Sequence, residues 1–109
     1  MPYLGPFEQL ILFSVLQLKK EAYGVSIREN IEERTGRAVS VGAIYTTLGR
    51  LEDRGLVRSR VEEPRGRTGR PRKYYALSAE GARELRASYA SIQSMASGLI
   101  SELDTLAES

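Results

Sequence analysis

Two neighbouring groups of side chains in this sequence have the chemistry to bind an anion. One is in the stretch SVGAIYTTLGRLEDRGLV (residues 40–57), whose polar members share one side of a helical pattern: Ser40, Tyr45, Thr46 and Arg50. The other is the run PRGRTGRPRK (residues 64–73), which supplies the cations Arg65, Arg67, Arg70, Arg72 and Lys73. Hydroxyl, guanidinium and ammonium groups donate hydrogen bonds to phosphate and carboxylate oxygens. They point to binding rather than to bond-making chemistry.

The positive charge of the chain is concentrated in one short segment. The whole chain has 16 basic and 14 acidic residues, a net charge of +2. Residues 54–77 alone carry +6, whereas residues 1–53 carry −1 and residues 78–109 carry −3. Such a segment fits contact with a polyanion, and on composition alone a solvated arginine-rich loop fits equally well.

The residues that most enzymes use at neutral pH are missing. The chain has no cysteine and no histidine, which excludes disulfides, thiolate nucleophiles, zinc-thiolate sites and histidine bases. We therefore expect no catalytic residue, no metal and no cofactor. No apolar run approaches the roughly 18 residues of a membrane span, and the start MPYLGPFEQ lacks a basic signal segment. We expect a cytoplasmic protein without a membrane partner.

Two helices are predicted ahead of residue 40. The stretch FEQLILFSVLQLKK (residues 7–20) is apolar on more than one side. In so small a domain, this favours contact with another subunit over a helix that only faces its own core. The stretch VSIRENIEERTG (residues 25–36) places Ile27 and Ile31 on one side and ends at a glycine, a common helix stop.

A third helix is predicted to begin after Ser40, whose hydroxyl suits an N-cap. Its expected buried stripe consists of Val41, Ile44, Leu48 and Leu51. Gly49 in the helix interior costs roughly 1 kcal/mol relative to alanine. This cost is typical of a surface that must approach something closely, and Gly42 and Gly49 share the polar side.

The rest of the chain reads as a hairpin followed by a long helix. LVRSRVE (residues 56–62) and KYYALS (residues 73–78) alternate as strands do, and the prolines and glycines between them indicate a loop. From Ser78 onward the apolar residues recur at steps of three and four, a heptad seam typical of helix-to-helix packing. We favour a dimerisation arm over a helix that folds back on its own chain.

This order predicts a mainly α fold with a small β-hairpin. Two helices across a turn followed by a hairpin form a winged helix-turn-helix, here at residues 1–77, and residues 78–109 form a long C-terminal dimerisation helix. In such folds the second helix enters the major groove of DNA, where Arg50 would bind a phosphate or a guanine edge. The wing cations, Arg65 included, would follow the backbone or enter a minor groove.

Four stretches resemble successive motifs of the PadR-like transcriptional regulators: YLGPFEQLILFSVL, EAYGVSIRENIEERTG, SVGAIYTTLGRLEDRGLV and RKYYALSAEG. The resemblance implies a homodimer that usually represses promoters, with the C-terminal helix packed on the partner's first and last helices. It also implies that the following residues contact DNA: Ser40, Val41, Gly42, Tyr45, Thr46, Arg67, Arg70, Arg72 and Lys73.

The expected dimer interface combines the first helix with the heptad seam. Its residues are Phe7, Ile11, Leu85, Tyr89, Ile92, Ala96, Leu99, Leu103 and Leu106. The expected partners are a second copy and double-stranded DNA with an inverted-repeat operator. An unidentified small-molecule effector in a cleft between the subunits, near Phe13 and Met95, stays open beside a dry packed interface.

Other function classes are weighed against this one. A winged helix can serve as a protein–protein interaction module without specific DNA binding, although the +6 segment favours DNA. An RNA-binding module is disfavoured because exposed aromatic residues on a sheet and a KH-type glycine loop are missing.

Overall fold

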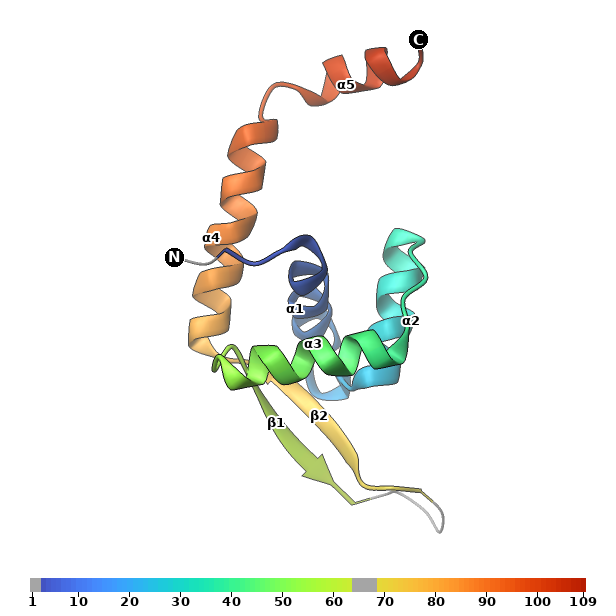
Figure 1. The fold of residues 1–109 in the computed structure, drawn as a ribbon, viewed down its shortest axis with the longest axis vertical. Coiled ribbons are helices and arrows are strands. Elements are labelled where there is room, and N and C mark those ends of the chain that lie inside the picture. Colours follow the sequence, from blue (N-terminus) through green and yellow to red (C-terminus); the bar gives the residue numbers. More distant parts are fainter. Residues whose placement is uncertain (1–2, 64–68) are drawn as a thin grey trace.

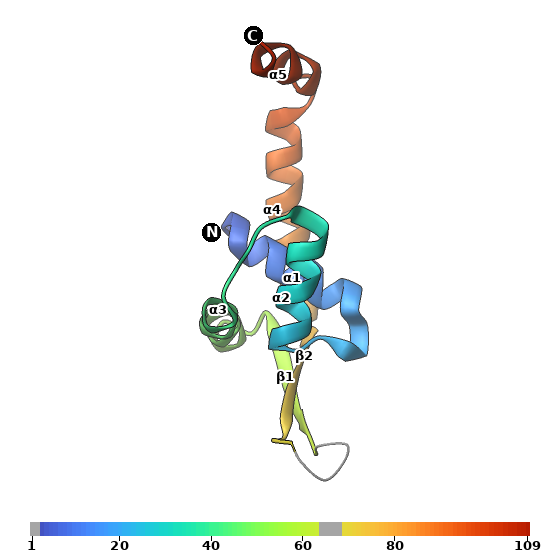
Figure 2. The same ribbon diagram turned by 90° about the vertical axis from the view of Figure 1, so that its right-hand side faces the viewer.

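The computed structural model describes residues 3–63 and 69–109. Three helices open the chain: α1 (Pro6–Leu18), α2 (Gly24–Thr35) and α3 (Val41–Asp53), with a short 3-10 turn η1 (Lys19–Glu21) after α1. The strands β1 (Val57–Glu62) and β2 (Arg72–Leu77) follow, and then α4 (Ala79–Ala96) and α5 (Ile100–Ala107). Figures 1 and 2 show the hairpin and the α4–α5 arm at opposite ends of the long axis.

Local capping explains where the first helices begin and end. The Glu8 carboxylate accepts a hydrogen bond from the Gly5 amide at 2.8 Å, and Pro6 occupies the first helical position of α1. The hydroxyl of Ser40 accepts from the Ala43 amide at 3.0 Å, as predicted for an N-cap of α3. Gly36 ends α2 in the left-handed region, with φ of 75°.

One hydrophobic core holds the three helices and the hairpin together. Its buried members come from α1, α2, α3, the hairpin, the start of α4 and the segments between them, and include Ile11, Ile27, Ile44, Leu48 and Tyr75. The predicted stripe of α3 is buried at Ile44, Leu48 and Leu51 and partly buried at Val41. Because this face of α3 is fixed in the core, the opposite face is turned to solvent.

The hairpin is an antiparallel pair in which Val57 faces Leu77 and Glu62 faces Arg72. Its open edge at β2 is partly covered, because the Tyr75 amide donates to the Ala22 carbonyl at 2.8 Å. The alternation in β2 predicts one core tyrosine, Tyr75, and the structure buries Tyr74 as well. Tyr74 is covered by Tyr23, whose ring lies edge-on to it at 5.6 Å.

The junction between the hairpin and α4 is fixed by one serine. The Ser78 hydroxyl donates to the Gly55 carbonyl at 2.7 Å and accepts from the Gly81 amide at 2.9 Å, which caps α4. Gly81 itself lies so close to the Leu56 carbonyl that a Cβ there would collide with it. The start of α4 is therefore held against the end of α3.

The C-terminal part differs from the single long helix expected over residues 78–109. It consists of α4 and α5, separated at Ser97 and Gly98, where Gly98 has φ of 81°. Ser97 leaves the helical conformation with ψ of 126°, and Gly98 follows in the left-handed region, so α4 ends although the apolar spacing continues across the break. Beyond Leu85 and Ser88, the side chains of this arm are largely exposed.

In the described part of the chain, no helix combines the length and the apolar character needed to cross a membrane.

Candidate nucleic-acid interface

The exposed face of α3 consists of small and polar residues. Gly42, Tyr45, Thr46, Gly49 and Arg50 are all exposed, as the sequence predicts. A Cβ at Gly42 or Gly49 would meet no neighbour within 4 Å, so neither glycine is required by packing inside this chain. What they provide is a flat helix surface that the backbone of another molecule can approach closely.

Tyr45 is placed by a glycine from the preceding helix. A Cβ on Gly24 would collide with the Tyr45 ring, so the ring lies directly on the backbone at the start of α2. Tyr45 nevertheless remains 42% exposed. The ring is thereby fixed between α2 and α3 while its edge stays in solvent, where a phosphate or base could meet it.

Ser40 and Arg50 lie at opposite ends of the exposed face. The Ser40 hydroxyl accepts from an amide of the first turn, so its own hydrogen stays free to be donated. The Arg50 guanidinium is exposed, and its nearest polar contact is a long one, to the Thr47 hydroxyl at 3.5 Å. Arg50 is therefore tethered weakly to its own helix and can extend to a ligand.

The cations of the wing fall into two groups. Arg65 and Arg67 lie outside the described residues. Arg70, Arg72 and Lys73 are described and exposed. Arg72 stacks over the Tyr23 ring at 4.1 Å, and Arg60 of β1 lies 4.8 Å from the Tyr74 ring.

This stacking fixes the base of the wing. The neighbouring side chain of Tyr74 is the main cause that raises the pKa of Arg72, and Tyr23 raises it further. Cation–π contacts of this kind contribute about 0.5–1 kcal/mol at exposed sites, so they orient the side chain more than they stabilise the fold.

A carboxylate joins the wing to α3. Glu52, near the end of α3, accepts from the Ser59 hydroxyl at 2.5 Å and lies 3.4 Å from the Lys73 ammonium. The hydrogen bond from Ser59, together with the nearby Lys73, lowers the pKa of the Glu52 carboxyl. The angle between α3 and the wing is therefore held by contacts to both strands.

Comparison with known protein families assigns the chain to a family. The model of the transcriptional regulator PadR-like family matches residues 12–87, which include α2, α3 and the wing. The protein belongs to the PadR-like family.

Solved structures support the assignment of this PadR-like protein. A PadR family transcriptional regulator from Eggerthella lenta DSM 2243 is 30% identical, with 89% of this chain and 83% of that chain covered and a TM-score of 0.70. A PadR family regulator from Clostridium difficile R20291 is 28% identical, with 91% and 99% covered and a TM-score of 0.71. F93 from STIV, a winged-helix DNA-binding protein, is 20% identical, with 89% and 98% covered and a TM-score of 0.71, which confirms the winged-helix fold. No curated protein matches the chain.

Sequence reasoning about the PadR-like protein missed the residues that position its interface. Tyr23 holds Arg72, Gly24 seats Tyr45, and Glu52 holds Lys73. The role of Gly24 had a signal in the sequence. A glycine at the start of a helix has no side chain, so a bulky side chain can pack against the backbone there. No local pattern marks the other two, since their partners are at least 20 residues away in sequence.

The structure separates the predicted dimer residues into three groups by their exposure. Ile11 is fully buried and Leu85 is 4% exposed, both in the core of the protomer, so a partner could contact little of either side chain, and their place in the interface stays a prediction. Phe7 is partly buried against that core. The remaining predicted residues lie along α4 and α5 with partly or largely exposed side chains: Tyr89, Ile92, Ala96, Leu99, Leu103 and Leu106.

Within residues 3–63 and 69–109, no group of three or more acidic side chains is arranged to hold a metal ion.

Proposed function

We propose that this PadR-like protein is a homodimeric repressor that binds an inverted repeat in duplex DNA. The α3 helix lies in the major groove, and the cations of the wing lie on the backbone or in the adjacent minor groove. One observation carries the proposal. The exposed face of α3, with Tyr45, Thr46 and Arg50, adjoins a wing whose cations Arg72 and Lys73 are held by Tyr23 and Glu52.

The residues have distinct roles in this proposal. Arg50 is the candidate for a bidentate contact to guanine, because its guanidinium is exposed and only weakly tethered. Ser40, Val41, Gly42, Tyr45 and Thr46 provide close approach and contacts to phosphates or bases. Arg70, Arg72 and Lys73 neutralise phosphates, and Arg65 and Arg67 of the same segment add to this charge.

The second copy is supported by apolar surface that one chain leaves uncovered. Ile92 is 62% exposed and Met95 is 77% exposed on α4, and the apolar residues Leu103 and Leu106 of α5 are exposed as well. A hollow of about 380 Å³ between α1 and α4 is lined mostly by apolar side chains, among them Leu16 and the paired rings of Phe13 and Tyr89. Large exposed apolar patches mark interaction sites. A two-fold partner would cover this one with an identical surface.

Selection of bound fragments from a random duplex pool tests the proposal. We expect an inverted repeat with half-sites about one helical turn, or 10–10.5 bp, apart. On that operator, the double variant Arg70→Ala/Arg72→Ala should bind more weakly. It should also reduce the slope of log K against log salt by up to about 2, because two phosphate contacts are lost.

The matched control is Arg83→Ala, which removes an exposed charge from α4, outside the proposed interface. Its affinity and salt slope should equal those of the wild type. Enrichment of no sequence, or an unchanged slope in the double variant, would contradict the assignment of α3 or of the wing, respectively.

A further inference from the structure

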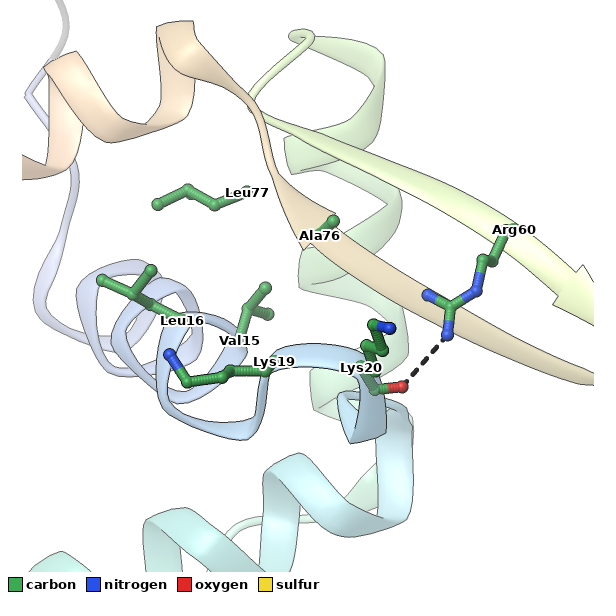
Figure 3. Close-up of a pocket in the computed structure, with 7 residues that line it drawn as sticks. All are labelled: Val15, Leu16, Lys19, Lys20, Arg60, Ala76 and Leu77. Atoms are coloured by element: carbon green, nitrogen blue, oxygen red, sulfur yellow. Dashed lines mark hydrogen bonds between the residues drawn. The ribbon is translucent and has the colours of Figure 1, made fainter.

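A second pocket lies on the body of the molecule, away from the exposed face of α3. It has a volume of about 300 Å³ and opens between the end of α1 with η1 and the strand β2 (Figure 3). Its apolar wall consists of Val15 and Leu16 from α1 and of Ala76 and Leu77 from β2. This volume is at the lower end of the range for small-molecule sites, about 300–1,000 Å³.

Three cations border this apolar wall. Lys19 and Lys20 come from η1, and Arg60 comes from β1, across the pocket in Figure 3. Arg60 is held in place, because its guanidinium donates to the Lys20 carbonyl at 3.1 Å and to the Glu62 carboxylate at 2.7 Å. With Arg60 paired to Glu62, the two lysines leave the rim of the pocket positively charged.

Lys19 has an unusual backbone for a lysine. Its φ is 54° and its ψ is −118°, and it is the one non-glycine residue with positive φ in the described part of the chain. A conformation of this kind costs of the order of 1–3 kcal/mol for a residue with a Cβ, and glycine adopts it freely. Strain of this kind concentrates at functional sites, and Lys19 places it at the rim of the pocket.

We propose that this pocket binds a small amphipathic carboxylate. The aliphatic chain lies on Val15, Leu16, Ala76 and Leu77, and the carboxylate pairs with Lys19 and Lys20 beside Arg60. The ligand would bridge the body at η1 and the hairpin at β1 and β2, and so hold the wing against the body. This inference goes beyond DNA binding, because the pocket shares no residue with the proposed contact face of α3 or with the described wing cations Arg70, Arg72 and Lys73. The pocket does share Leu16 and Leu77 with the hollow between α1 and α4, so the ligand would lie beside the surface that a second copy covers.

Calorimetric titration with octanoate tests the proposal on the full chain, with octanol and octylammonium as matched probes. We expect saturable binding of octanoate, and at least tenfold weaker binding of the neutral and cationic probes, because they cannot pair with the lysines. Octanol binding as tightly as octanoate would overturn the proposal and reduce the pocket to an apolar surface. Absence of saturable octanoate binding would overturn it as well.

Variants at Lys19 separate the charge from the backbone. Lys19→Gly should keep or raise the Tm, because glycine relieves the positive φ, and it should weaken octanoate binding at least about fivefold. Lys20→Gln should weaken binding similarly. The control Arg83→Gln removes a cation outside the pocket and should bind as the wild type does. Wild-type octanoate affinity in both lysine variants would overturn the proposal, whatever their stability.

Discussion

At the scale of single residues, the proposed interface depends on side chains that hold other side chains. Gly24 has no Cβ and therefore lets the Tyr45 ring rest on the backbone of α2. In the wing, the Tyr23 ring holds Arg72 by a cation–π contact, and the Glu52 carboxylate holds Lys73 by an ion pair. None of these three positioning residues needs to touch DNA. Their effect is to reduce the number of conformations that the contacting groups must give up on binding.

Glu52 gives a prediction about stability and pH. Its folded pKa is lowered by the Ser59 hydroxyl and Lys73, so the carboxylate stabilises the fold above the unfolded pKa of about 4.3. This stabilisation is lost as the pH falls through the lower folded pKa. The side chain is 33% exposed, so we expect Glu52→Gln to cost about 1 kcal/mol or less at pH 7.

Urea unfolding of both proteins at pH 7 and at pH 3 measures this cost. The difference between wild type and variant should shrink at the lower pH, where the wild-type carboxyl takes up its proton. A difference of the same size at both values would mean that the charge of Glu52 contributes nothing and that only its shape matters.

At the scale of elements, the molecule consists of a fixed domain and an arm that this domain only partly supports. The first half of α4 is anchored by Ser78, by the Arg54–Glu84 ion pair at 2.8 Å, and by the Ser88 hydroxyl, which accepts from the Leu4 amide at 3.0 Å. Beyond Ser88 the arm is largely exposed. The chain changes direction at Gly98, between α4 and α5. The direction of α5 therefore depends on local backbone conformation more than on packing.

Replacement of Gly98 tests this dependence. Alanine disfavours φ of 81° by about 1–2 kcal/mol and favours a helix over glycine by about 1 kcal/mol. We therefore expect Gly98→Ala to join α4 and α5 into one helix, with a stronger circular dichroism signal at 222 nm.

Gly49→Ala is the matched control, because Gly49 is already helical and a Cβ there meets no neighbour within 4 Å. It should leave the helix content unchanged. If Gly98→Ala also leaves the helix content unchanged and only lowers the Tm, the break is imposed by something other than the glycine.

At the scale of the whole molecule, the chain is too extended for a self-contained domain of its length. Its radius of gyration is 16.2 Å, whereas a compact domain of about 100 residues has a value of about 13 Å. The excess comes from the hairpin and the α4–α5 arm, which project at opposite ends (Figures 1 and 2). The exposed apolar residues of the arm are the part of the surface that a second copy would cover.

The arm predicts a variant that separates dimerisation from folding. Ile92→Asp places a charge at a position that is 62% exposed in the protomer, so the fold should survive. In a two-fold dimer the change occurs twice, and each lost apolar side chain costs about 2 kcal/mol. The total of roughly 4 kcal/mol corresponds to about a thousandfold increase in the dimer Kd.

Sedimentation equilibrium measures this increase. Ser91→Asp adds the same charge to the neighbouring, exposed residue off the heptad seam, and should leave the Kd near that of the wild type. A wild-type chain that sediments as a monomer, or an Ile92→Asp variant that still dimerises as the wild type does, would contradict the proposed interface.

The sequence by itself determined the first three helices and the two strands, and which face of α3 is polar. Helix caps such as Ser40, the apolar stripe of α3 and the alternation of the strands are local features, set within one or two turns of chain. The exposed face of α3 followed from the same periodicity, because the buried stripe leaves only one face to solvent. The basic character of the wing followed from charge counting alone.

Only the tertiary structure decided which side chains meet. The burial of Ile11 and Leu85 in the protomer, the seat of Tyr45 on Gly24 and the hold of Glu52 on Lys73 all join segments distant in sequence. The break between α4 and α5 at Gly98 was not predicted from the heptad seam, because the spacing of apolar residues does not depend on the φ of a single residue. Periodicity reports which side of an element is buried. Which partner covers that side depends on how the elements pack in three dimensions, and no local pattern contains that information.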